Sequence, residues 1–314
     1  SLWKTLRNQD NSSMGAFRIL GKFGGGNRNM LFEAQKIKFE DAEQNLAQLQ
    51  VSQFIKFPAK HIIDSSYAQL KNSNDTFVLK ESWNVIKFFL MSTVEMNDER
   101  QNLQNHLNQQ GFLYNDIIEN NQVIYVENVI LKTALSAMFL AASKKELNKD
   151  AHPFAIFIVN QFTIASISNQ FTQQSANLTC NPCYILDGVL SIMESEEKEV
   201  YAFGNSILLS IIKLASCIVG SRDRVCKLTL MQSMFDRILS LFYERSTFAK
   251  KGGCIALRFL CDEMPSSWIS KHLFSIVKAH IFVIRDLADD VCSGTVDVAI
   301  QNIEVINEKT IPCL

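Results

Sequence analysis

A group of glycines near the start of the chain could in principle bind a nucleotide. Residues 21–27 read GKFGGGN, and the backbone N–H groups of closely spaced glycines can cradle a phosphate. A phosphate-binding loop also needs a Gly-Lys-Ser/Thr sequence after its glycines and a strand before them, and this sequence has neither. A helix that ends in a left-handed glycine cap explains Gly24 to Asn27 directly. We therefore predict a helix end here, with no nucleotide bound.

Two cysteines at metal-ligand spacing form the second candidate for chemistry. Cys180 and Cys183 make a CxxC motif, but a zinc site needs a second pair of ligands at similar spacing. The nearest histidine, His152, lies on the far side of a predicted helix. A redox role would require a βαβ context, which the sequence lacks. We interpret the two residues as loop cysteines.

The histidines and glutamates do not complete a site either. His272 and His280 share one predicted helix, but they are eight residues apart, which is too far for a single metal ion. Glu194, Glu196, Glu197 and Glu199 precede another predicted helix, where carboxylates favourably face the positive end of the helix dipole. We therefore assign no catalytic, cofactor-binding or metal-binding residue, and expect no cofactor and no enzymatic activity.

The charge of the chain argues against nucleic acid as a partner. The chain has 31 basic and 32 acidic residues, for a net charge of −1, so it has no net field to hold a polyanion. Its small basic clusters stand next to predicted helix ends, where a cation offsets the dipole or stays solvated. These clusters are Lys144 with Lys145, Arg222 with Arg224, and Lys250 with Lys251. We expect no direct binding of nucleic acid.

The cysteines and one long apolar run indicate the environment of the chain. All eight cysteines lie in its C-terminal half, most of them in apolar helical runs. This pattern predicts reduced core thiols in the cytosol or nucleus. Residues 201–220 are long enough to cross a bilayer, but Lys213 lies well inside them. A charge at that depth is costly in lipid, so we expect a buried inner helix and no membrane.

The elements that hold these residues are predicted to be helices. Hydrophobic residues make up 47% of the chain, with only 12 Gly and 5 Pro, and the apolar residues recur at spacings of three and four, as on one face of a helix. From Leu228 this stripe continues through Met231, Phe235, Ile238 and Phe242. The predicted helices cover residues 12–23, 59–72, 76–95, 122–142, 152–170, 198–219, 222–242, 246–263, 267–287 and 291–307.

These helices suggest a repeat. Taking 198–242 and 246–287 as two antiparallel pairs gives a period near 45 residues, within the range of HEAT repeats. Such pairs bury their apolar faces by stacking on neighbours. We predict an all-α fold, an α-solenoid of HEAT-like antiparallel helix pairs. Residues 1–314 would form a single continuous segment of a larger protein, with loop insertions near 33–57 and 171–184.

Two consecutive glycines stand out inside one predicted helix. Gly252 and Gly253 would each cost on the order of 1 kcal/mol in a helix interior, so something must offset them. A residue without a Cβ atom allows a neighbouring helix to approach closely, or allows positive φ at a break. We predict a structural role at a helix contact for this pair.

Two segments resemble a known family. Residues 20–31 (LGKFGGGNRNML) and 248–260 (FAKKGGCIALRFL), the latter with Met264, Pro265 and Trp268, are similar in the same order to the HEAT region of the transformation/transcription domain-associated protein (TRRAP) family. The segment 196–221 resembles the part between them. The resemblance spans most of the chain and is faint across 33–57, 97–120 and 171–190.

The resemblance implies a function. It implies a non-catalytic member of the phosphatidylinositol-3-kinase-related family, a nuclear scaffold of SAGA-type and MYST-type histone acetyltransferase complexes that receives DNA-bound activators. The expected partners are subunits of those complexes and transcription activators. The family's kinase-like domain is considered inactive, and no position here matches it. A HEAT scaffold of another class, such as a nuclear transport receptor or a phosphatase scaffold, remains the alternative.

Overall fold

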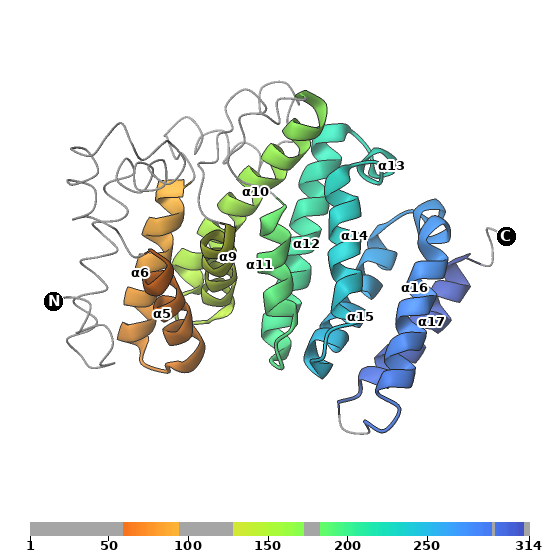
Figure 1. Ribbon diagram of the computed structural model, residues 1–314. Helices are drawn as coiled ribbons and strands as arrows, with labels where there is room; N and C mark the ends of the chain where they lie inside the picture. Colours follow the sequence, from red (N-terminus) through yellow and green to blue (C-terminus); the bar gives the residue numbers. More distant parts are fainter. Residues whose placement is uncertain (1–58, 94–127, 173–182, 291–292, 311–314) are drawn as a thin grey trace, which may run out of the picture.

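The computed structural model describes residues 59–93, 128–172, 183–290 and 293–310, and every element in these ranges is a helix. The helices stand side by side in a row (Figure 1), from α5 and α6 at one end to α16 and α17 at the other. They are α5 (Ala59–Asn72), α6 (Thr76–Thr93), α9 (Asn128–Ser143), α10 (Asn148–Thr172), α11 (Tyr184–Met193), α12 (Lys198–Val219), α13 (Arg222–Val225), α14 (Thr229–Leu241), α15 (Thr247–Glu263), α16 (Ser266–Asp286) and α17 (Thr295–Thr310).

The row has two layers. Contacts run from α5 to α9, α11, α15 and α17 along one layer, while α10 contacts α12 and α14 in the other. Stacking of Phe235 on Trp268, with ring centroids 5.3 Å apart, extends the second layer from α14 to α16. Across the layers, α9 pairs with α10, α11 with α12, α14 with α15 and α16 with α17. The predicted all-α solenoid of stacked helix pairs is confirmed in the described ranges.

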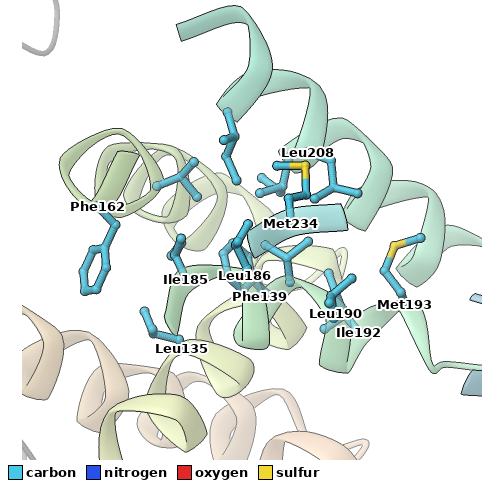
Figure 2. Close-up of a cluster of buried hydrophobic side chains, with 14 of the residues drawn as sticks. Leu135, Phe139, Phe162, Ile185, Leu186, Leu190, Ile192, Met193, Leu208 and Met234 are labelled. Carbon is cyan, nitrogen blue, oxygen red and sulfur yellow. The ribbon is translucent and has the colours of Figure 1, made fainter. Parts of the chain in front are cut away.

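Apolar side chains fill the space between the layers. Figure 2 shows part of this core, where Leu135 and Phe139 of α9 lie beside Ile185 and Leu186 of α11. Helix α9 is buried along most of its length, because it packs against α5, α6, α10 and α11. The core continues without a break from Ile62 in α5 to Ile306 in α17.

Several predicted boundaries were wrong. Helix α11 was missed, because its ten residues follow a polar stretch that suggested a loop over 171–184. Of that expected loop, residues 173–182 lie outside the described ranges, as do the loop at 33–57 and the helix at 12–23. The pairing was also shifted. Helix α12 packs mainly on α10 and α11, whereas α14 packs on α15.

The predicted helix over 222–242 is divided into α13 and α14. Helix α12 ends at Gly220, whose φ of 85° is a left-handed cap, and Ser221 caps α13 by accepting a hydrogen bond from the Arg224 N–H. The side chain of Gln170, from α10, then accepts from the backbone N–H of Thr229 at 2.8 Å, which satisfies a free donor at the start of α14. Local sequence patterns cannot predict a helix cap that comes from a residue 59 positions away.

The two glycines of α15 allow close helix packing, as predicted. Gly252 and Gly253 are both buried. A Cβ atom on Gly252 would lie 2.1 Å from the carbonyl oxygen of Met193, at the end of α11. One on Gly253 would lie 3.0 Å from the Leu241 Cβ. Both glycines keep helical φ values, so α15 is not broken at this point. Of the two predicted explanations, the close approach of a neighbouring helix is therefore the correct one.

Candidate interaction surface

The described residues bring together no cluster suited to a metal. Among them, no group of three or more His, Cys, Asp or Glu side chains could hold an ion. Cys183 precedes α11, with its Sγ 3.6 Å from the Ser166 Oγ, while Cys180 lies outside the described ranges. Residues 24–27, with their three glycines, also lie outside them. Neither the CxxC motif nor the glycine loop is therefore tested by the structure.

The two histidines of α16 serve different contacts. The ring of His272 packs against Phe235 and Trp268, with centroid separations of 4.4 and 4.7 Å. His280 is fully buried, with its Nδ1 2.8 Å from the Ile276 carbonyl oxygen. Because a carbonyl only accepts, Nδ1 must carry the proton. The Nε2 then accepts from the Asn302 side-chain amide at 3.0 Å.

Asn302 completes a polar network that joins three helices. Its amide nitrogen donates to the Cys254 carbonyl at 2.8 Å as well as to His280. Asn302 lies in α17, and the two N–H groups of its amide donate to acceptors in α15 and α16. A buried hydrogen-bond network of this kind fixes how the three helices meet, so we assign His280 and Asn302 a structural role.

We expect the stability of this end of the stack to fall in mild acid. Burial lowers the pKa of His280 below its usual 6.5, and it lowers the pKa of His272 in the same direction. The folded state therefore binds fewer protons than the unfolded chain. The stabilisation is present above pH 6.5 and is lost as pH falls from 6.5 toward the lowered pKa.

Urea unfolding at about pH 7.5 and about pH 5.5 measures this effect, and the midpoint should be lower in acid. A His280→Gln variant should be less stable at both pH values, with a smaller difference between them. An equal pH dependence in parent and variant would show that other groups cause it.

Two of the cations singled out in the sequence form ion pairs between helices. Lys250 was expected next to a helix end, where it would offset the dipole or stay solvated, but it is 4% exposed and pairs with Asp286 of α16 at 2.7 Å. Arg222 pairs with Glu263 of α15 at 2.9 Å. Arg222 and Lys250 therefore join neighbouring helices and are not part of a basic surface patch in the described structure.

The acidic run is divided between two helices. Glu199 lies in the first turn of α12, and Glu197 is its N-cap residue, as the dipole argument expected. Glu194 instead caps the C-terminus of α11. Burial there raises its pKa, with a further increase from Glu244 and a decrease from Lys71. The prediction of a helix start is therefore wrong for Glu194.

The cysteines were predicted to be core thiols, and this is correct for some of the described ones. Cys254 and Cys261 are buried in α15, and burial raises the pKa of each to about 12, so both are inert as nucleophiles. Cys217 is exposed on α12, contrary to the prediction of a core thiol, because it lies on the face turned away from α10 and α11. No disulfide joins Cys217, Cys226, Cys254 and Cys261 in the described structure.

Two described helices are long and apolar enough to cross a membrane by length and composition. In 148–168 of α10, 83% of the apolar window is buried inside the protein. In α12 the buried share is 44%, and Lys213 on its outer face is exposed. Helix α12 is therefore a half-buried member of its layer, which corrects the expectation of a buried inner helix.

The remaining candidate is a surface on the outer side of α16. Phe274 is 80% exposed, and Ile281 and Phe282 are also exposed on the same helix. Tyr243, from the end of α14, stacks on Phe282 with a centroid separation of 4.8 Å. Exposed apolar groups gathered in one place mark interaction sites more often than single ones do. This surface was not predicted from the sequence, although Phe274 and Ile281 fall outside the core stripe of Ile269, Ile276 and Val283.

The fold defines an α-helical repeat protein of the solenoid class. Residues 18–311 match the family model of the Tra1 HEAT repeat ring region, so the chain belongs to that family. The TRRAP resemblance is thereby confirmed, and the family separates the chain from transport receptors and phosphatase scaffolds.

Three relatives place this family in transcription. The chain is 34% identical to Transcription-associated protein 1 of Drosophila melanogaster, over 95% of this chain and 8% of that protein. It is 28% identical to the human transformation/transcription domain-associated protein, over 97% of this chain and 9% of that protein. A Saccharomyces cerevisiae relative, 21% identical over 55% of this chain and 5% of that protein, is named as a subunit of the SAGA and NuA4 acetyltransferase complexes. The chain thus spans less than a tenth of these relatives.

Proposed function

We propose that the chain is a non-catalytic scaffold segment of a transcription coactivator in nuclear histone acetyltransferase complexes. The observation that carries this proposal is the match of nearly the whole chain to the Tra1 ring region, together with a relative named as a SAGA and NuA4 subunit. The buried network and interhelical ion pairs support a structural role for the polar residues inside the stack. We infer no catalytic, cofactor-binding or metal-binding residue.

We also infer the extent of the segment and the partners of its outer faces. The chain is one continuous HEAT-like segment, 1–314, of a larger protein, in keeping with its small share of each relative. Its outer faces bind other subunits of the complex and support recruitment by DNA-bound activators. Neither membrane nor nucleic acid is a direct partner, which agrees with the balanced charge of the chain.

Affinity purification tests the proposal. The protein is tagged at the gene that encodes it and purified from nuclear extract. We expect a histone acetyltransferase catalytic subunit to co-purify in near-stoichiometric amount, with acetyltransferase activity on nucleosomes. Purification of the protein with a nuclear transport cargo or a phosphatase, and without acetyltransferase activity, would contradict the proposal.

A further inference from the structure

A short segment between α12 and α14 is held by other helices at both of its ends. It consists of the cap residue Ser221, helix α13 and the turn that leads to Thr229, the first residue of α14. We call residues 221–229 the junction. In Figure 1 it lies at the same edge of the row as the end of α10 and the turn between α15 and α16. These two neighbours belong to different helix pairs.

Gln170 of α10 makes three hydrogen bonds with one end of the junction. Its side-chain oxygen accepts from the backbone N–H of Thr229 at 2.8 Å and from the Thr229 hydroxyl at 3.1 Å. Its side-chain N–H donates to the Lys227 carbonyl at 3.4 Å. The Thr229 N–H stands at the start of a helix, where the helix itself provides no acceptor. A single side chain therefore fixes this end of the junction to α10.

The other end of the junction is held by the end of α15. The Arg222 Nη2 pairs with the Glu263 carboxylate at 2.9 Å, and the Cys226 Sγ lies 3.9 Å from the Met264 Sδ. The second terminal nitrogen of the same guanidinium, Nη1, is buried and has no hydrogen-bond partner in the described structure. A buried donor without an acceptor is costly. Arg222 would therefore gain hydrogen bonds to water if the junction moved outward.

Backbone hydrogen bonds connect the two ends of the junction. Four consecutive N–H groups each donate to a carbonyl three or four residues earlier, those of Val225, Cys226, Lys227 and Leu228. The buried side chains of the junction are Val225 and Leu228, while Gln170 and Arg222 are half-buried. A segment with few buried apolar groups opens at a lower free energy than the whole fold. The junction is therefore suited to open as one unit.

We propose that the junction is a conformational latch that couples α10 to α15. In the closed state Gln170 holds one end and Glu263 holds the other. In the open state both contacts are broken together, Arg222 is hydrated and the start of α14 is unpaired. A change that withdraws either Gln170 or Glu263 therefore loosens the whole junction. The latch goes beyond the scaffold role proposed above, because it lets a contact on one helix pair alter the next.

Native-state hydrogen exchange of the 314-residue chain, resolved to single amides, tests the proposal. Gln170→Ala should speed exchange in the junction about fivefold or more, because it removes the hydrogen bonds to α10. The factor should be the same for Leu228, near Gln170, and for Val225 and Cys226, near the other end, since one opening exposes all of these amides. Glu263→Gln weakens the opposite contact, and it too should speed exchange of the three amides by a common factor.

Two further variants serve as controls. Gln232→Ala makes the same substitution in the first turn of α14, where the side chain donates to Asp236 and not to α10. It should leave exchange in the junction within about twofold of the parent, as for a site without a shared partner. Gln170→Glu keeps the acceptor for the Thr229 N–H and loses the donor to the Lys227 carbonyl. Its exchange rates should lie between those of the parent and Gln170→Ala.

Three results would overturn the proposal. Faster exchange of Leu228 in Gln170→Ala, with Val225 and Cys226 unchanged, would show that the two ends open separately. Equal acceleration by Gln232→Ala would show that any loss of a polar side chain in this region has the same effect. Faster exchange from α10 to α17 in Gln170→Ala would mean that the substitution destabilises the whole stack and does not open one segment.

Discussion

Replacement of Gly252 by valine is expected to destabilise the stack by about 3 kcal/mol or more, the upper end of the cost of overpacking. The new Cβ would stand 2.1 Å from the Met193 carbonyl oxygen. That oxygen belongs to the backbone at the end of α11, so no side-chain rotation can relieve the overlap. Helix α15 would have to move away from α11. Gly252→Val with Gly253→Val should be worse, because Gly253 is close to Leu241 and Phe242.

The neighbouring lysine provides the control for this experiment. Lys251 is half-buried, and its ammonium donates to the Ser293 carbonyl at 2.9 Å. Lys251→Ala should therefore cost about 1 kcal/mol, the usual net value of one hydrogen bond. Thermal unfolding of the variants measures both effects. A glycine variant that melts with the parent and loses only binding to a partner would contradict the packing explanation.

Truncation of Phe139 to alanine is expected to cost about 3 to 5 kcal/mol, as for other buried phenylalanines. Its ring is fully buried in α9, within the cluster of Figure 2. It also lies against α11, since a Cβ atom on Gly188 would be 3.1 Å from its Cε2. The helices around Phe139 are closely packed, so they have little freedom to move into the cavity that the alanine would leave. The cost should therefore be near the upper end of the range.

Phe274→Ala is the matched control, because it removes the same side chain from a position that is 80% exposed. Its free energy of unfolding should differ from the parent by about 0.5 kcal/mol or less, as for most surface changes. Urea unfolding of the two variants gives the comparison. Equal losses would mean that the α9–α11 contact is not a packed core.

Hydrophobic spacing predicted the fold class and most helix positions, for a physical reason. A helix in a stacked pair has to bury one stripe, and the spacing of that stripe is local information. Thus α5, α12, α15 and α16 lie within one or two residues of their predicted starts. The pairing of helices depends on contacts between distant residues, so it was predicted less well.

The errors arise where a distant residue decides the local structure. The break before α14 is stabilised by Gln170 of α10, and Lys250 is buried because Asp286 of α16 is placed beside it. Neither partner could be identified from nearby sequence. The sequence predicted that Gly252 lies at a close helix contact. Only the structure shows that its partner there is the Met193 carbonyl. Phe274 and Ile281 of α16 are exposed because they lie outside the buried stripe of that helix, and hydrophobic spacing predicts only the buried stripe.

If this segment acts by binding other proteins, as we propose, cross-linking of the purified complex should show it most directly. The tagged protein is isolated from nuclear extract, treated with a lysine-reactive cross-linker and analysed by mass spectrometry. We expect cross-links from exposed lysines, such as Lys213, Lys271 and Lys278, to other subunits of a histone acetyltransferase complex. Cross-links from these lysines only to the protein's own chain would contradict it.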